Sequence, residues 1–94
     1  MRIAGREKLD DFVRTHADAR AWIENWIADT EKAMWRTSRD IKSSYASASF
    51  LTGNVVIFNV KSNHYRLQVL VAYNTGVVVI LWAGTHTRYT KRMR

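Results

Sequence analysis

Three residues in the second half of the sequence carry side chains suited to phosphate chemistry: Arg66, His86 and Tyr89. A guanidinium can grip phosphate oxygens with two parallel hydrogen bonds. An imidazole exchanges protons near neutral pH and can act as a general acid or base. A phenol can stack on a nucleobase or assist a proton transfer. Together they could cleave RNA, whose own 2′-hydroxyl is the nucleophile and needs alignment, proton removal and charge stabilisation.

Other common chemistries find few suitable residues. No acidic residue follows Asp40, so hydrolysis by paired carboxylates or two metal ions has no ligands in the second half of the chain. His64 and His86 could share a metal ion but lack a third ligand. Cysteine is absent, and neither a glycine-rich phosphate loop nor a Ser–His–Asp order is present.

The positive charge of the chain is confined to its second half. Residues 1–40 contain eight basic and eight acidic residues, whereas residues 41–94 contain seven basic residues and no acidic one. The net charge of +7 therefore falls on residues 41–94, which indicates a polyanionic partner there. An acidic membrane is the competing partner, but no basic amphipathic helix is evident, so we expect no membrane association.

Length and composition indicate a single domain over residues 1–94. At 47% hydrophobic and 24% charged, the chain is typical of a globular protein rather than a disordered one. Its start, MRIAGREKLDDF, does not resemble a signal peptide, and VVVILWA is far shorter than the roughly 20 residues that span a bilayer. With no cysteine, the composition suits a reducing compartment, and we expect a cytoplasmic protein.

The first half of the chain is predicted to be helical. GREKLDDFVRTHADA places three apolar residues at helical spacing, and DARAWIENWIADTEKAMW repeats the pattern with a broader apolar stripe that includes tryptophans. We expect Asp18 to cap the second helix and Trp22 and Trp26 to pack in the core. TSRDIKSSY is typical of one further helical turn, with Thr37 or Ser38 as its cap.

After residue 45 the pattern changes to strands. SFLTGNVVIFNVK, HYRLQVLVAY and VVVILWAGT are rich in β-branched and aromatic residues and are separated by turn signals. Short connections predict an antiparallel meander, to which residues 2–4 could add an edge strand. The order predicts an α+β fold, with the N-terminal helices packed on one face of a 3–4-stranded antiparallel sheet.

Two turns fix the expected register of the strands. Ser62–Asn63 fits a two-residue hairpin loop, and NTG at 74–76 fits a three-residue loop with Gly76 in the left-handed conformation. The residues then expected opposite each other are Val60 and Tyr65, Asn59 and Arg66, Tyr73 and Val77, Arg66 and Gly84, and His64 and His86.

Alternation of side chains along the strands then separates two faces. The face expected under the helices comprises Phe58, Val60, Tyr65, Leu67, Val69, Val71, Val79 and Leu81. The open face comprises Asn59, Lys61, His64, Arg66, Gln68 and His86. Gly84, opposite Arg66, would leave room there for a phosphate. The competing interpretation is a solvated surface whose polar residues keep the chain soluble.

The same residues carry a resemblance to a known family. SYASASFL, VVIFNVKSNHYRL and WAGTHTRY are similar to segments of the HigB family of type II toxins, which are mRNA interferases related to RelE. Members of that family share an SAS segment, a hairpin of the form FN-aliphatic-K-G-N-x-Y-R-L and a closing GTH-x-x-Y. The residues in matching places are Phe58, Asn59, Lys61, Asn63, Tyr65, Arg66, Leu67, Gly84, Thr85, His86 and Tyr89.

The resemblance implies a RelE-like fold that cleaves mRNA in the ribosomal A site, without a metal or organic cofactor. It also implies a helix-turn-helix, HigA-like antitoxin as a partner. The catalytic residues would be Arg66, His86 and Tyr89. Contacts to RNA are expected from Asn59, Lys61, Asn63, His64, Arg88, Lys91 and Arg92.

The sequence departs from the family pattern at four positions. Ser62 stands where relatives usually have glycine, and Leu81 stands where several place a charge. Many relatives end in EYD, whereas Arg88 and Thr90 replace both acids here and make the tail more basic. Two alternatives to an endoribonuclease remain open: a non-catalytic module that binds RNA or the ribosome, and a DNA-binding partner in a repressor complex.

Overall fold

The protein folds as a five-stranded sheet with helices on both sides, and its structure, a computed structural model, describes residues 1–62 and 64–92. Its elements are β1 (Arg2–Ala4), α1 (Arg6–Thr15), the 3₁₀ turn η1 (Ala17–Ala19), α2 (Arg20–Lys32), α3 (Ser38–Ser44), β2 (Ser49–Leu51), β3 (Val55–Val60), β4 (Tyr65–Ala72), β5 (Val77–Thr85) and α4 (His86–Arg92). The strand order is β1-β5-β4-β3-β2, and every neighbouring pair is antiparallel except β1 and β5. The predicted α+β class is confirmed.

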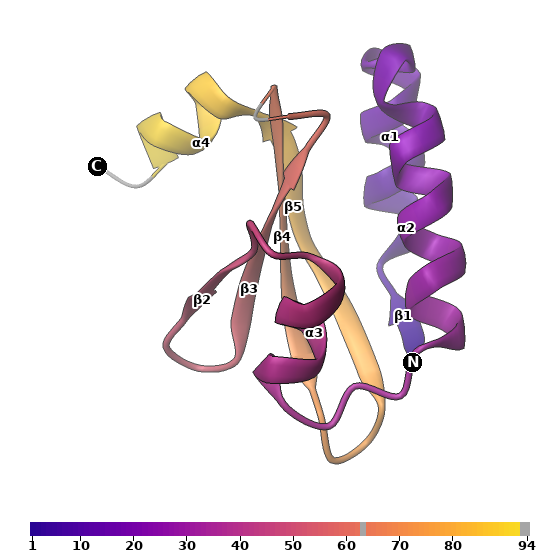
Figure 1. Ribbon diagram of the computed structural model, residues 1–94. Coiled ribbons are helices and arrows are strands. Elements are labelled where there is room, and N and C mark those ends of the chain that lie inside the picture. The colour runs from indigo at the N-terminus through magenta and orange to yellow at the C-terminus, as the bar shows by residue number, and fades with distance from the viewer. Residues whose placement is uncertain (63, 93–94) are drawn as a thin grey trace.

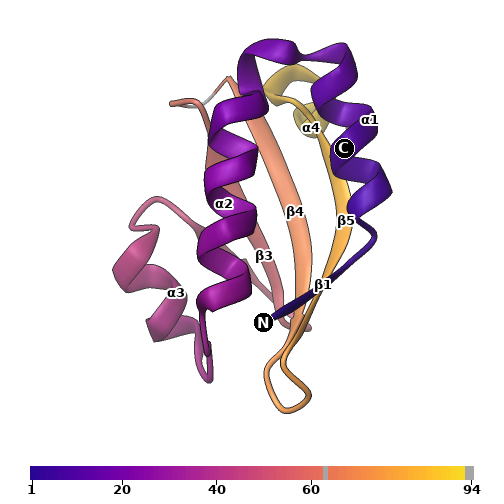
Figure 2. The same ribbon diagram turned by 90° about the vertical axis from the view of Figure 1, so that its right-hand side faces the viewer.

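The N-terminal helices cover one face of this sheet. Figure 1 shows α1 and α2 together on one side, with α4 on the other, and Figure 2 shows α1 and α2 in front of the strands, with α3 beside α2. The apolar stripe of α1 is buried, as its helical spacing predicts, and Trp26 of α2 is 1% exposed. Trp22 is half-buried and packs at the border of the core.

The helix ends differ in part from the predictions. Thr37 caps α3, as predicted, through a capping box with Asp40. Asp18 does not cap α2, because η1 intervenes and Ala19 occupies the cap position without a side-chain bond. The second helix was predicted to continue through Met34, but it ends at Lys32 and leaves Met34 75% exposed.

The sheet has more strands than predicted. Gly53 and Asn54 both have positive φ, which turns the segment predicted as one strand back on itself and divides it into β2 and β3. The edge strand predicted at residues 2–4 is present as β1, and it runs parallel to β5.

The hairpin of β4 and β5 contains an irregularity that the sequence did not reveal. Ala72, rather than Tyr73, lies opposite Val77, so the loop has one residue more than predicted. A register shift at Gln68/Val69 then leaves Leu81 as an extra residue on β5. Two assignments to the buried face are therefore wrong: Val78 and Ile80 are buried in place of Val79 and Leu81. The other strand residues of that face are buried or, for Tyr65, half-buried, as predicted.

Candidate functional site

Arg66 is the second residue of the central strand, β4, and lies on the face opposite α1 and α2. It pairs with Asn59 of β3 and with Gly84 of β5, as predicted from the two turns. Its side chain is half-buried, and its Nη1 donates to the carbonyl of Tyr65 over 3.4 Å. A guanidinium so placed is held by the central strand rather than by a loop, which fixes its direction.

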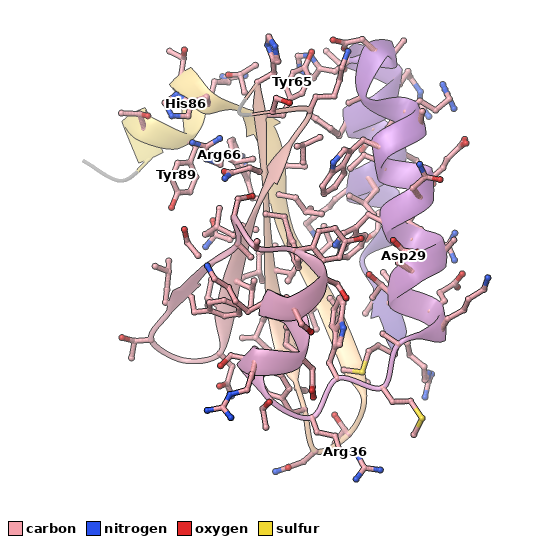
Figure 3. The ribbon with its side chains drawn as sticks, viewed as in Figure 1. Asp29, Arg36, Tyr65, Arg66, His86 and Tyr89 are labelled. Carbon is pink, nitrogen blue, oxygen red and sulfur yellow. The ribbon has the colours of Figure 1, made fainter. Side chains whose placement is uncertain are left out.

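His86 and Tyr89 reach the same face from a helix that was not predicted. The Thr85 hydroxyl oxygen accepts a hydrogen bond from the Arg88 amide over 3.1 Å, so Thr85 acts as the N-cap of α4. Because His86 and Tyr89 are three residues apart on this helix, their side chains lie on the same side of it. Figure 3 shows both, with Arg66, on the side of the sheet away from α1 and α2. A threonine directly before the helix is the signal in the sequence that could have predicted it.

A backbone contact joins the first residue of α4 to the hairpin of β3 and β4. The His86 amide donates to the carbonyl of His64 over 3.2 Å, which continues the ladder of β4 and β5 by one pair and confirms that His64 lies opposite His86. The first turn of α4 is therefore tied to the same two strands that place Arg66. The His64 side chain is exposed, and its ring centroid lies 6.3 Å from that of Tyr65.

The space expected over Gly84 is occupied by an indole. A Cβ atom at Gly84 would lie 2.5 Å from the Trp82 ring, so this ring covers the glycine and the predicted room for a phosphate at that point is wrong. The Trp82 ring centroid is also 6.1 Å from that of Tyr89, with the planes inclined by 40°. Trp82 is a residue of the site that the sequence reasoning missed; its signal was an aromatic residue two positions before Gly84, on the same side of the strand.

Lys61 lies away from the open face on which it was predicted. Lys61 has a φ of +51°, and its Nζ is 3.5 Å from Oδ2 of Asp18, on the side of the helices. Asp18 also accepts a hydrogen bond of 2.7 Å from the Tyr65 hydroxyl. This bond lowers the pKa of Asp18 and raises the pKa of Tyr65. The carboxylate that draws Lys61 toward the helices is distant in sequence, and no spacing rule predicts the contact.

The remaining residues predicted to contact RNA have different surroundings. The Asn59 amide donates to the carbonyl of Ser47 over 3.2 Å and so holds the loop that precedes β2. Arg88 is exposed and lines a hollow beside the free edge of β5. Asn63 and the side chains of Lys91 and Arg92 lie outside the described residues.

Acidic residues are confined to the helices of the first half of the chain and are absent from the strands that follow. All acidic residues lie in residues 1–40, on α1, η1, α2 and α3, whereas β2 to β5 and α4 contain none. Within residues 1–62 and 64–92, no three His, Cys, Asp or Glu side chains meet as metal ligands do. None of the helices in these ranges is long and apolar enough to cross a membrane.

A comparison with protein families identifies the family of the chain. Residues 19–92, which are most of the chain, match the HigB_toxin family, described as the RelE-like toxic component of a toxin–antitoxin system. The chain belongs to the HigB toxin family. The protein is thus a toxin, and its place in a toxin–antitoxin system implies an antitoxin partner. A search among curated proteins found none that matches the chain.

In this HigB-family toxin, the match covers every residue of the candidate site. The matched range begins in η1 and ends in α4, so it includes Arg66, Trp82, His86 and Tyr89 and omits only β1 and α1 among the larger elements. The assembled groups are one guanidinium, one imidazole, one phenol and one indole. They can bind an anion, move a proton and stack on an aromatic ring, which are the operations that RNA cleavage by its own 2′-hydroxyl needs.

Proposed function

We propose that this toxin is an endoribonuclease that cleaves mRNA on the ribosome, in the A site. The observation that carries the proposal is the placement of Arg66, His86 and Tyr89 on one face of the sheet, from β4 and from a helix capped at the end of β5. The strands and helix that bear these residues contain no carboxylate to repel a phosphate. We further propose a cytoplasmic site of action and a helix-turn-helix, HigA-like antitoxin as the partner.

The proposed reaction is an internal transfer of the phosphoryl group. The 2′-oxygen of one nucleotide forms a bond to the adjacent phosphorus, and the bond from phosphorus to the 5′-oxygen breaks. The proton lost by the 2′-hydroxyl is balanced by the proton gained by the 5′-oxygen. His86 acts as the acid or base, and Arg66 neutralises the added charge on the phosphorane. Tyr89 assists a proton transfer or stacks on a base.

The residues proposed to bind RNA are basic or polar residues of the β3–β4 hairpin and of α4. His64, Arg88, Lys91 and Arg92 are proposed to contact the RNA backbone around the reacting phosphate. Lys61 and Asn59 hold Asp18 and Ser47, respectively, so we assign them a smaller share of RNA binding. Asn63 is proposed as a further contact from the hairpin loop.

The test is cleavage of an mRNA during translation in a purified system. His86→Ala should slow cleavage by about 10²–10⁴-fold, because it removes a general acid or base. Binding to ribosomes should persist, since the cationic residues remain. Arg36→Ala is the matched control: Arg36 is exposed and lies far from Arg66 in Figure 3, so its loss should leave cleavage unchanged.

Growth arrest in cells separates an enzyme from a binding module. A double variant that lacks both Arg66 and His86 should no longer arrest growth when expressed without antitoxin. If arrest persists, the protein acts by binding RNA or the ribosome, and the enzyme proposal is wrong. A gel shift of operator DNA by the toxin alone should be negligible at physiological salt; a clear shift would favour the repressor alternative.

A further inference from the structure

Trp82 stands next to the proposed catalytic residues without a role in the mechanism. It pairs with Gln68 of β4, while the next residue on its side of β5, Gly84, pairs with Arg66. Since side chains alternate along a strand, Trp82 and Arg66 lie on the same face of the sheet. Trp82 is half-buried, so part of a large aromatic surface is accessible beside the site.

Gly84 fixes the position of this indole. A side chain at Gly84 would bring its Cβ atom to 2.5 and 2.7 Å from the two nearest ring atoms of Trp82, so any larger residue would push the ring aside. Tyr89 of α4 is a second neighbour of the ring, with 6.1 Å between centroids. The indole is thus held between a strand and a helix, so little conformational entropy is lost when a ligand binds to it.

A hollow of about 800 Å³ opens at this indole. Its lining includes Trp82, Gly84 and Arg88, together with Lys8 and Asp11 of α1 and with His16, which directly follows that helix. The hollow follows the edge of β5 beyond Val79, where β1 has ended and no strand in the described ranges pairs with it. Its volume is within the roughly 300–1,000 Å³ of typical ligand sites.

We propose that Trp82, together with Tyr89, is the stacking platform for a nucleobase next to the reacting phosphate of the RNA. The proposal rests on the function proposed above and adds a subsite to it. A fixed indole beside a guanidinium matches a nucleotide, which presents a π-face next to an anion. Stacking accepts any base, so this subsite orients the RNA without selecting its sequence. Gly84 is required because it makes room for the ring.

A set of tryptophan variants tests the stacking role. Trp82→Ala should lower kcat/KM for cleavage of mRNA on the ribosome by about tenfold or more, whereas Trp82→Phe keeps a ring and most of the activity. Trp22→Ala is the matched control, because Trp22 is also half-buried and also lies 6.1 Å from a tyrosine, Tyr45, but on the helix side. Thermal unfolding of each variant shows that the measured protein is folded.

An abasic substitution in the RNA separates stacking from a packing role under α4. Abasic nucleotides are placed one at a time around the cleaved bond, in mRNAs presented to wild-type toxin and to Trp82→Ala. At one position, the losses of cleavage rate caused by the abasic site and by Trp82→Ala should not add. Once the base is absent there, removing the indole should lower the cleavage rate by less than about twofold. Full additivity at every position, or wild-type cleavage by Trp82→Ala, would overturn the proposal.

A binding experiment distinguishes failure of this subsite from failure of the enzyme. The four indole N–H signals of the toxin are followed by NMR during titration with a short single-stranded RNA that carries 2′-deoxy nucleotides and cannot be cleaved. Trp82→Phe identifies the relevant signal, which should shift more than those of Trp22, Trp26 and Trp35. An unmoved Trp82 signal in a toxin that cleaves mRNA would overturn the subsite alone. A toxin that binds this RNA through Trp82 but cleaves no mRNA would retain the subsite and refute the endoribonuclease.

Discussion

The two faces of the sheet use the same kinds of side chain for different purposes, and neighbouring residues of β4 show it. Tyr65 points to the helices, where its ring packs edge-on against Phe12 and its hydroxyl donates to Asp18. Arg66 points the other way, to the face that bears His86 and Tyr89. One residue of displacement along a strand therefore separates a group that stabilises the fold from one that we propose to act on RNA.

The difference between the faces lies in the acids more than in the aromatics. Tyr65 and Tyr45, on the helix side, each donate a hydrogen bond to a carboxylate, from Asp18 and Asp29. Tyr89, on the open side, has Trp82 as its ring neighbour instead. All acids belong to residues 1–40, whereas β2 to β5 and α4 contain basic residues and no acidic one, which favours a polyanionic partner on the open face.

Replacing Arg66 should give the largest effect and should affect activity more than stability. Arg66→Ala should reduce kcat/KM for mRNA cleavage by up to about a thousandfold, near 4 kcal/mol, because it removes charge stabilisation from the transition state. Arg66→Lys should recover only part of this, since an ammonium cannot bind two phosphate oxygens in parallel. Equal activity of the lysine and arginine proteins would show that simple charge suffices and would weaken the proposed geometry.

Replacing the next two residues of β4 should affect stability according to the face on which each residue lies. Leu67 is fully buried, so Leu67→Ala should lower the free energy of unfolding by about 2–5 kcal/mol, measured by urea denaturation. Gln68→Ala, on the open face, should change it by less than about 0.5 kcal/mol. A large loss for Gln68→Ala would mean that the open face also holds the fold together.

Two tyrosine-to-phenylalanine changes should separate the two faces by their effect on stability. Burial, and then the bond to Asp29, raise the pKa of Tyr45 above its ordinary value of about 10. A raised pKa gives stability that is complete below about pH 10 and is lost as the pH rises toward the folded-state value. Tyr45→Phe should cost about 1 kcal/mol at neutral pH, because both partners are partly exposed, and should flatten this alkaline loss.

The counterpart on the open face is Tyr89→Phe. It should slow cleavage if the hydroxyl assists proton transfer, or leave it unchanged if only the ring stacks. Either way its unfolding curve at neutral pH should match that of the wild-type toxin, as chemical denaturation would reveal. A stability loss as large as that of Tyr45→Phe would remove the contrast between the two tyrosines.

The smallest effect is expected at Arg88, the third residue of α4. Arg88→Glu would complete a capping box with Thr85 and place an acid at the positive end of the helix, stabilising α4 by about 0.5–1 kcal/mol in amide hydrogen exchange. It should also weaken RNA binding and make the affinity for RNA less dependent on salt, by about the amount expected for the loss of one phosphate contact. Arg88→Gln is the matched control, since glutamine can form the box without a negative charge. Unchanged exchange in both variants would contradict the capping argument.

Local sequence patterns were sufficient for several parts of this protein. Apolar spacing predicted α1 and most of α2, and Thr37 predicted the start of α3, because these depend on neighbours within one or two turns. The placement of Arg66 opposite Gly84 is correct for a less simple reason. The loop is one residue longer than predicted, and the irregularity at Leu81 restores the register beyond it.

Other features depended on contacts between residues far apart in the sequence. Leu81 was placed on the buried face because alternation continues unbroken in a sequence, whereas a bulge arises where a twisted strand must fit its partner. Lys61 turns to Asp18, 43 positions away, and the Trp82 ring closes over Gly84. The sequence by itself determined which residues could carry the chemistry and that their half of the chain lacks acids. Only the tertiary structure decided which of them meet, because that depends on strand twist, side-chain volume and the direction of α4.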